Sequence, residues 1–94
     1  MKPIRFTWDP DKETSNLSKH GVSFTEAKSV FLDENGIEFY DDEHSEWEDR
    51  FLLLGFSTKL RLLMICHCYR SDEGIIHIIS ARKATNEEAK YYKR

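Results

Sequence analysis

Cysteine is scarce in this sequence, and the two cysteines present cannot build a disulfide framework. Cys66 and Cys68 are separated by a single residue in a strand-like segment. In a regular strand both side chains point to the same face, which is poor geometry for a mutual disulfide. Buried, reduced thiols are therefore expected. His67 would point the opposite way and no second Cys/His pair exists elsewhere, so Cys66-His67-Cys68 does not fit a zinc-binding motif either.

Long apolar runs are missing as well. No stretch approaches the roughly 20 apolar residues of a membrane-spanning helix, and no secretory leader precedes Phe6. Internal repeats, linkers and low-complexity segments are also absent. The 94 residues, with 39% hydrophobic and 13% aromatic content, predict a small core in one domain that spans residues 1–94. We expect this domain in the cytoplasm.

Basic residues are missing from one part of the chain. Residues 32–49 carry nine Asp and Glu and no Lys or Arg, whereas residues 1–31 have a net charge of +1 and residues 50–94 a net charge of +5. The net charge of −3 argues against a high-affinity, nonspecific nucleic-acid binder. It does not exclude an enzyme that contacts one or two phosphates, because the basic residues can gather on one face.

Helix signals are clear at three places. Asp9 and the proline that follows it are typical of a helix start, and Gly21 of a helix end. Residues 23–26 and residues 85–88 both fit a capping box, which predicts that a helix follows each. The expected helices occupy residues 10–19, residues 24–32 and the C-terminal residues after 85.

Strand signals surround these helices, and the expected strands are residues 4–8, 37–40, 50–57, 61–69 and 75–81. The connections between the last three strands are short, which predicts consecutive antiparallel hairpins. The sequence therefore predicts an α+β domain: an antiparallel meander sheet with two N-terminal helices and a C-terminal helix.

Strand alternation sorts the polar candidates into two sets. In the strand 61–69, Arg61, His67 and Tyr69 share a face opposite Cys66 and Cys68. A sheet surface with Arg, His and Tyr is typical of RNA-cleaving sites, where arginines neutralise the phosphate and a His or carboxylate moves the 2′-hydroxyl proton. In the strand 75–81, one face is expected to hold Ile76, Ile78, Ser80 and Arg82, and the other Ile75, His77, Ile79 and Ala81.

Each candidate also has a structural explanation, which the sequence leaves open. A histidine in mid-strand, such as His67, is typically half-buried and hydrogen-bonded. Arg61 follows a turn and could be solvated, whereas Arg82 could bridge to the acidic loop. Glu48 and Arg50 could form a surface ion pair of less than ~1 kcal/mol.

Three sequence blocks form a more specific pattern. They are Trp8-Asp9-Pro10-x-Lys12-x-x-x-Asn16-Leu17-x-Lys19-His20-Gly21-Val22-Ser23-Phe24-x-Glu26-Ala27, then His44-Ser45-x-x-Glu48-x-Arg50-Phe51-x-x-Leu54-Gly55, then Ile78-Ile79-Ser80-Ala81-Arg82-Lys83-Ala84-Thr85. In this order the blocks resemble the BrnT family of toxins from bacterial type II toxin–antitoxin modules. The resemblance covers essentially the whole chain.

The resemblance implies a RelE-like fold and an endoribonuclease that cleaves RNA without a metal or other cofactor and so arrests translation. It implies a BrnA-type antitoxin as partner, in a complex of two toxins with two antitoxins, and contact with DNA only through that antitoxin. The catalytic residues expected are Glu48, Arg61, Arg82 and His67. A second, substrate-binding set comprises Lys19, His20, His44, Arg50, Ser80 and Lys83.

In this scheme Arg61 and Arg82 stabilise the phosphate, while Glu48 or His67 acts as general base. The other of these two residues, or His44, is the general acid. Two further hypotheses stay open. A catalytically degenerate toxin could only pair with its antitoxin and modulate transcription. A metal-dependent hydrolase using His44, Glu48, His67 and His77 fits less well, because the two strand histidines have no evident common register.

Overall fold

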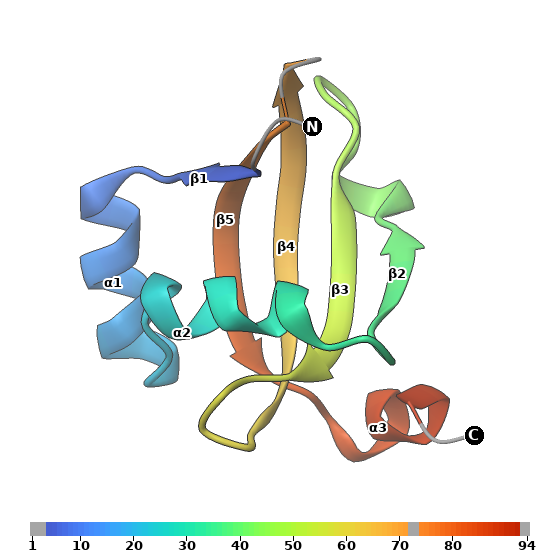
Figure 1. Ribbon diagram of the computed structural model, residues 1–94. Coiled ribbons are helices and arrows are strands. Elements are labelled where there is room, and N and C mark those ends of the chain that lie inside the picture. The colour runs from blue at the N-terminus through green and yellow to red at the C-terminus, as the bar shows by residue number, and fades with distance from the viewer. Residues whose placement is uncertain (1–3, 72–73, 93–94) are drawn as a thin grey trace.

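The computed structural model describes residues 4–71 and 74–92 of the chain. One five-stranded sheet in the order β1-β5-β4-β3-β2 forms its centre (Figure 1). The strands are β1 Arg5–Thr7, β2 Ile37–Tyr40, β3 Phe51–Phe56, β4 Leu62–Ser71 and β5 Ile75–Lys83. The connection between β4 and β5 was predicted at residues 70–74; Asp72 and Glu73 of that connection lie outside the described residues.

The prediction of an antiparallel meander holds for four strands and is wrong for the fifth. Strands β2 to β5 pair antiparallel in sequence order, but β1 pairs parallel to β5 at the edge of the sheet. Two α-helices and three strands separate β1 from β5 along the chain, and no hairpin fixes the direction in which β1 pairs. The sheet is therefore mixed.

The helices begin and end where local capping chemistry places them. Helix α1 spans Pro10–His20: the Asp9 side chain accepts a hydrogen bond from a backbone N–H of its first turn, and Gly21 ends it with φ 70°. This left-handed conformation suits glycine, which has no Cβ. The remaining helices are α2 Phe24–Ser29, continued by the 3₁₀ turn η1 Val30–Leu32, and α3 Asn86–Tyr92. In residues 4–71 and 74–92, no helix has the length and apolar character to cross a membrane.

One of the two predicted capping boxes is complete. At α3, the Thr85 hydroxyl accepts from the Glu88 N–H at 3.1 Å, and the Glu88 carboxylate accepts from the Thr85 N–H at 2.9 Å. At α2, Ser23 caps the helix but the carboxylate of Glu26 does not reach back. Glu26 turns instead toward Ser57 and Arg61, because a buried carboxylate is stabilised more by a guanidinium than by one N–H.

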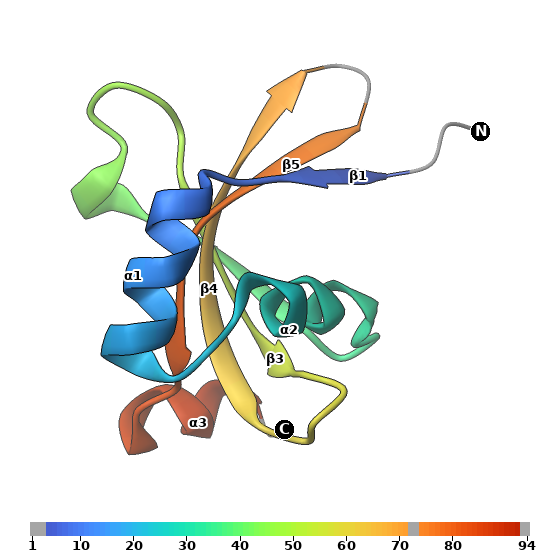
Figure 2. The same ribbon diagram turned by 90° about the vertical axis from the view of Figure 1, so that its left-hand side faces the viewer.

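The sheet separates two unlike sides of the molecule (Figure 2). We name them the α2 side, covered in part by α2 and η1, and the α1 side, flanked by α1, the segment 41–50 and α3. The core lies on the α2 side, where buried residues of both helical segments and three strands pack together: Val22, Phe24, Ala27, Val30, Leu53, Leu63, Ile65, Ile78 and Ala81. The α1 side is left more open.

Asn16 fixes α1 against the edge of the sheet. Its Nδ2 donates to the backbone carbonyls of Val22 and Ala81, at 2.9 and 2.8 Å, and its Oδ1 accepts from the N–H of Ala81 at 3.1 Å. The side chain is buried, so these three bonds satisfy groups that water cannot reach. Helix α1 consequently forms a wall beside β5.

A β-bulge changes which residues of β5 reach the α1 side. Cys66 pairs with Ser80 but His67 pairs with Ile78, so Ile79 is an extra residue in the ladder. The extra residue moves one set of side chains across the sheet. The predicted alternation after Ile78 is therefore wrong: Ala81 lies in the core with Ile78, whereas His77, Ile79, Ser80 and Arg82 line hollows on the α1 side.

Candidate active site

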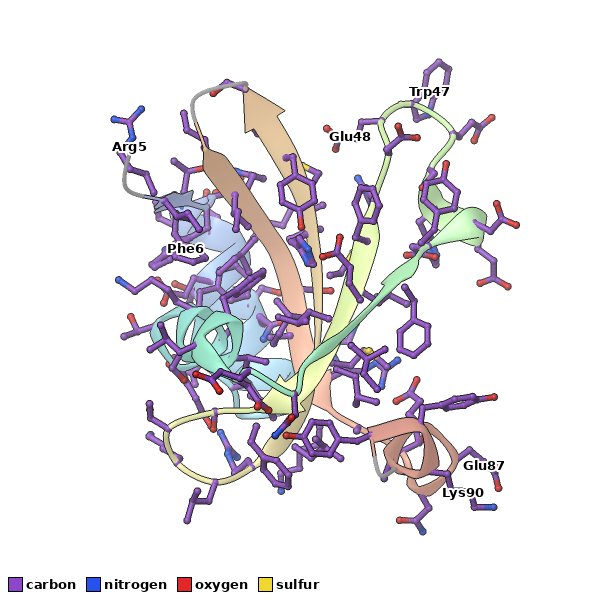
Figure 3. All side chains as sticks on the ribbon, turned by 45° about the vertical axis from the view of Figure 1, so that its right-hand side comes forward. Arg5, Phe6, Trp47, Glu48, Glu87 and Lys90 are labelled. Atoms are coloured by element: carbon purple, nitrogen blue, oxygen red, sulfur yellow. The ribbon has the colours of Figure 1, made fainter. Side chains whose placement is uncertain are left out.

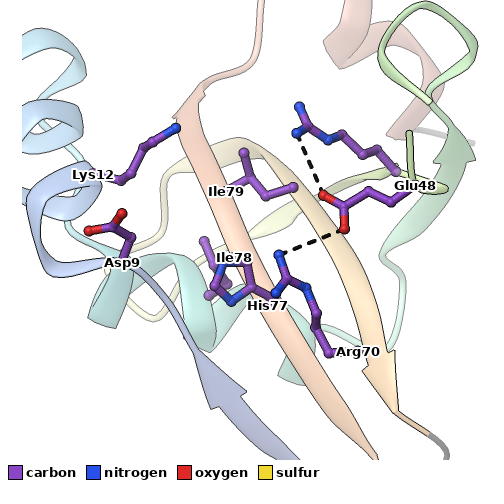
Figure 4. A pocket seen from close by; sticks show the side chains of 8 residues that line it. Asp9, Lys12, Glu48, Arg70, His77, Ile78 and Ile79 are labelled. Carbon is purple, nitrogen blue, oxygen red and sulfur yellow. Dashed lines mark ion pairs between the residues drawn. The ribbon is translucent and has the colours of Figure 1, made fainter. Parts of the chain in front are cut away.

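Three adjoining hollows lie on the α1 side, and Ile79 of β5 borders all of them. The first hollow, shown in Figure 4, is lined by six charged or titratable residues: Asp9, Lys12, Glu48, Arg50, Arg70 and His77. The second extends from Arg50 to Arg82, and the third lies against α1. The segment 41–50, the end of β4, the bulged part of β5 and α1 thus contribute to one concave surface.

Glu48 lies between two arginines in the first hollow. Its Oε2 is 3.6 Å from Nη2 of Arg50, and its Oε1 is 3.7 Å from Nη2 of Arg70 (Figure 4). Cys68, two residues before Arg70 on the same face of β4, accepts a hydrogen bond from Nε of Arg70 at 3.4 Å. The carboxylate therefore orients two guanidinium groups around one small space, an arrangement suited to a phosphate.

Arg50 connects the first hollow to the second, since it lines both. Its Nε is buried and has no hydrogen-bond partner among the described residues. A buried donor of this kind costs free energy unless something accepts from it. The ion pair with Glu48, at 3.6 Å, is longer than an ordinary hydrogen bond. Arg50 thus retains hydrogen-bonding capacity toward an anion.

Among the described residues that line the first hollow, His77 is the only histidine. Its Nδ1 lies 2.8 Å from Oγ1 of Thr7 on β1, which fixes the ring orientation. Burial lowers the pKa of His77 below its usual value, and the nearby Arg70 lowers it further. A half-buried imidazole with a lowered pKa is neutral at pH 7 and can accept a proton.

The second hollow contains Arg82, but Glu88 of α3 holds its guanidinium. Two hydrogen bonds of 2.8 and 2.9 Å join them in a bidentate pair. This arginine, helped by the cap at Thr85, lowers the pKa of Glu88 to about 2. His44 also lines this hollow, where its Nδ1 is 3.0 Å from Oδ2 of the buried Asp41. The charges in the second hollow are therefore largely paired.

The third hollow contains Lys19 and His20 from the last turn of α1, with Ser80 on the opposite wall. Lys12 borders both this hollow and the first. These residues extend the positive surface away from Glu48. Lys83, at the end of β5, is exposed and lines none of the three hollows.

Comparison with known proteins decides the family. The sequence model of the ribonuclease toxin BrnT of type II toxin–antitoxin systems matches residues 8–88. The chain belongs to this family. The family is thus one of ribonuclease toxins, and a type II system implies an antitoxin protein as partner. None of the curated proteins searched matches the chain.

The fold of the chain is similar to that of a solved BrnT toxin. The 1.1 Å crystal structure of the Brucella abortus ribonuclease toxin BrnT superimposes with a TM-score of 0.70 over 89% of this chain and 100% of that chain. The sequence identity is 20%, so this similarity concerns the fold. This chain and the solved BrnT toxin therefore share a fold.

Arg61, one of the residues expected to be catalytic in this BrnT-family chain, lies away from the hollows. Its Nε donates to Oε2 of Glu26 at 2.9 Å, and its Nη2 donates to the carbonyl of Gly21 at 3.0 Å and to Oε1 of Glu26. Arg61 in turn lowers the pKa of Glu26. The side chain ties the β3–β4 connection to the start of α2, and the structure does not bring it near Glu48.

His67 lies on the opposite side of the sheet from Glu48. It is fully buried, and its ring packs against Phe31 and Phe51, with centroids 4.9 and 6.2 Å away. The sequence analysis expected the face of His67 to be the reactive one. The η1 turn covers that face instead, and the cysteine-bearing face of β4 forms the floor of the hollows.

The structure adds three residues that the sequence analysis did not select for RNA chemistry: Lys12, Arg70 and His77. Lys12 is part of the first sequence block, so that signal was available. Arg70 was taken as a turn residue, but β4 extends to Ser71 and carries it over the hollow. His77 was assigned to the face opposite Arg82, and only the bulge at Ile79 places both on the α1 side.

A metal site is not assembled by the described part of the chain. No three His, Cys, Asp or Glu side chains in residues 4–71 and 74–92 converge as ligands. The four residues of the metal-hydrolase hypothesis do not come together either: Glu48 and His77 line the first hollow and His44 the second, but His67 is buried on the α2 side.

Proposed function

We propose that this BrnT-family toxin is a metal-independent endoribonuclease and that the first hollow is its catalytic site. The observation that carries the proposal is that two arginines, a lysine and a neutral histidine line that hollow together with the carboxylates of Glu48 and Asp9, and that Glu48 lies between the two arginines. RNA can be cleaved by such groups because its own 2′-hydroxyl is the nucleophile. The protein then supplies proton transfer and charge stabilisation.

His77 takes the role of general base. Its Nδ1 faces the Thr7 hydroxyl at 2.8 Å, so Nε2 is the ring nitrogen available to substrate. It removes the 2′-hydroxyl proton as the 2′-oxygen bonds to phosphorus and the bond to the 5′-oxygen breaks. The ammonium of Lys12, which lines the same hollow, returns a proton to the leaving 5′-oxygen. The products are a 2′,3′-cyclic phosphate and a 5′-hydroxyl.

Arg50 and Arg70 stabilise the charge that develops on the phosphate. Glu48 holds both guanidinium groups at 3.6 and 3.7 Å and so acts as a positioning residue. Arg82 lies in the adjoining hollow and contacts the next part of the RNA, together with Ser80, His44, Lys19 and His20. Arg61 and His67 are left out of this site, because their contacts lie elsewhere.

The remaining expectations from the BrnT resemblance join this proposal. The whole chain, residues 1–94, acts as one RelE-like toxin domain in the cytoplasm and arrests translation by cleaving RNA. A BrnA-type antitoxin neutralises it in a complex of two toxins and two antitoxins, which contacts DNA through the antitoxin. The four-stranded antiparallel part of the sheet, flanked by helices, supports the RelE-like assignment.

The proposal is tested by incubating the purified toxin with an RNA oligonucleotide of mixed sequence and its 2′-O-methyl copy. We expect cleavage of the RNA alone, with 2′,3′-cyclic phosphate ends and with an unchanged rate in EDTA. His77→Ala should lower the rate by about 100-fold or more, the usual contribution of one general base. The wild-type rate should rise with pH below about 6.5 and be level at pH 7, because the pKa of His77 is lowered.

Three results would contradict the proposal. Cleavage of the 2′-O-methyl copy would exclude attack by the 2′-hydroxyl. Full activity of His77→Ala and Glu48→Gln would remove the first hollow as the site. A folded wild-type chain that binds its antitoxin but leaves all RNA intact would show that it is a binding module instead.

A further inference from the structure

The upper half of the α2 side carries aromatic residues on three strands, beyond the part of the sheet that α2 and η1 cover. Figure 1 shows that α2 and η1 cross β3 and β4 below the upper ends of these strands, and no other helix of residues 4–71 and 74–92 lies over those ends on this side. Tyr40 on β2 pairs with Phe51 on β3, which in turn pairs with His67 on β4. Directly paired residues share a face, and so do residues two apart, which places Tyr69 beside them.

The rings form a continuous row. The centroids of Tyr40 and Phe51 are 5.6 Å apart, and those of Phe51 and Tyr69 are 5.3 Å apart. Tyr40 and Tyr69 are each about half exposed, at 50% and 51%. Large aromatic surfaces of this kind are enriched where proteins meet a partner.

Two carboxylates border the row, and neither has a basic partner in the described chain. The Tyr40 hydroxyl donates to Asp49 at 2.9 Å, and the Tyr69 hydroxyl donates to Glu38 at 2.8 Å. No Lys or Arg in residues 4–71 and 74–92 forms an ion pair with either carboxylate. We name the surface of Glu38, Tyr40, Asp49, Phe51 and Tyr69 the aromatic–acidic face.

His67, which lies beneath this face, does not supply a positive charge to pair with Glu38. Its Nδ1 is 3.1 Å from the carbonyl of Ile65, so Nδ1 carries the proton of the neutral ring and Nε2 a lone pair. Nε2 is fully buried, lacks a hydrogen-bond partner among the described residues and lies 3.9 Å from Oε2 of Glu38. Burial lowers the pKa of His67, so the imidazole is neutral at pH 7. Nε2 and Oε2 thus face one another as two acceptors with no proton between them, and Oε2 takes its hydrogen bond from the Tyr69 hydroxyl at 3.0 Å.

We propose that the aromatic–acidic face docks a basic segment of the antitoxin protein, with a lysine or arginine of that segment bound at Glu38 against the Tyr69 ring. This inference deepens the partner assignment and rests on the proposed function. Charge complementarity selects the occupant, because carboxylates without cations beside exposed aromatic rings attract a guanidinium or ammonium group.

RNA is the less suitable occupant of the same face. Base stacking on the tyrosines would bring phosphates close to Glu38 and Asp49, and like charges repel. The acidic segment 32–49 increases this repulsion, since it holds nine carboxylates and no basic residue. The arginines that suit RNA lie on the α1 side. The sheet thus separates a surface for RNA from a surface for a protein.

The test titrates the full-length toxin and its variants with the purified antitoxin of the same module, by calorimetry at fixed salt. Glu38→Lys should weaken binding by about tenfold or more, as expected when a central interface charge is reversed. Glu38→Gln, which keeps the size of the side chain, and Tyr69→Ala should weaken it by smaller factors. The matched control is Glu87→Lys: Glu87 on α3 points away from the sheet beside Lys90 (Figure 3) and should leave binding within twofold.

RNA cleavage measured on the same variants separates this inference from the proposed nuclease. Glu38→Lys should cleave as the wild type does, while Glu48→Gln should lose cleavage and keep antitoxin binding. Unchanged antitoxin binding by Glu38→Lys, Glu38→Gln and Tyr69→Ala, each folded by circular dichroism, would overturn the inference. So would loss of RNA binding, rather than antitoxin binding, in these variants. An inactive wild type would refute the nuclease without affecting the binding result.

Discussion

Glu38 and Glu48 are carboxylates on opposite sides of one sheet, and their neighbours differ. Glu48 lies between Arg50 and Arg70 on the α1 side. Glu38, on the α2 side, has a tyrosine hydroxyl and a neutral imidazole as partners. The comparison shows that position relative to arginines, rather than the carboxylate itself, distinguishes a site for an anion from a site for a cation.

Strand β4 contributes to both surfaces. On β4, Cys68 lies beneath Arg70 and Glu48, whereas its neighbours His67 and Tyr69 lie beneath or beside Glu38. Because successive side chains of a strand alternate between faces, two opposite electrostatic environments can be one residue apart in sequence. Substitutions on the two sides should therefore have separable effects.

The largest expected effect is on the rate of RNA cleavage, and it should distinguish two arginines that lie on opposite sides of the sheet. Arg70→Ala should lower the rate of RNA cleavage by roughly 100- to 1,000-fold with little change in stability, because it removes one donor to the developing charge. Arg61→Ala should lower the thermal unfolding midpoint, since Glu26 loses its buried ion pair, and should leave the cleavage rate per folded molecule unchanged. Single-turnover cleavage and thermal unfolding of both variants check this. Loss of cleavage by folded Arg61→Ala alone would reverse our placement of the site.

A smaller effect is expected where α1 meets β5. Asn16→Ala removes three buried hydrogen bonds to backbone groups and should lower the free energy of unfolding by about 2 kcal/mol. It should also weaken RNA binding more than antitoxin binding, because α1 is a wall of the RNA surface only. Urea denaturation measures the first effect, and Ser18→Ala on the exposed side of α1 is the matched control. Equal stability of the two variants would contradict this account of α1.

The smallest expected effect is the pH dependence of stability that arises from His67 on the α2 side. Burial lowers the pKa of His67, so below pH about 6.5 the unfolded chain binds a proton that the folded chain does not. Stability should therefore fall as the pH drops through that range, by at most about 1.4 kcal/mol per pH unit for this one group. His77 has a lowered pKa too and contributes in the same direction.

His67→Leu isolates the contribution of the buried imidazole. The variant should be about as stable as the wild type at pH 7.5, because removal of the buried Nε2, which has no partner, offsets the loss of the Nδ1 hydrogen bond to the Ile65 carbonyl. Its stability should then decline less steeply toward pH 5.5. Urea denaturation of both proteins at the two pH values measures the difference. Parallel declines would show that His67 is not the titrating group.

Much of the fold follows from local chemistry in the sequence. The cap at Asp9, the stop at Gly21 and the capping box of residues 85–88 each act within a few residues, and the structure confirms all three. The strands of the meander were also predicted, since their hydrophobic pattern and short connections are local signals. The parallel pairing of β1 was not, because it joins residues about 70 positions apart.

The site was less predictable than the fold. Glu48 and Arg50 were selected and do lie together, whereas Arg61 and His67 were selected and lie elsewhere. Alternation identified which residues share a face of β4 but not which face a helix would cover. For β5 it failed at the bulge, which no single sequence signal marked.

The sequence by itself determined the element types, the family and the separation of charge between residues 32–49 and the rest of the chain. Tertiary structure alone decided that α2 and η1 cover the His67 face and that the bulge at Ile79 brings His77 to the Arg82 side. The physical reason is the distance along the chain over which each kind of interaction acts. Caps, turns and periodicity depend on neighbours in the chain, whereas the choice of face depends on how distant segments bury their apolar surfaces together.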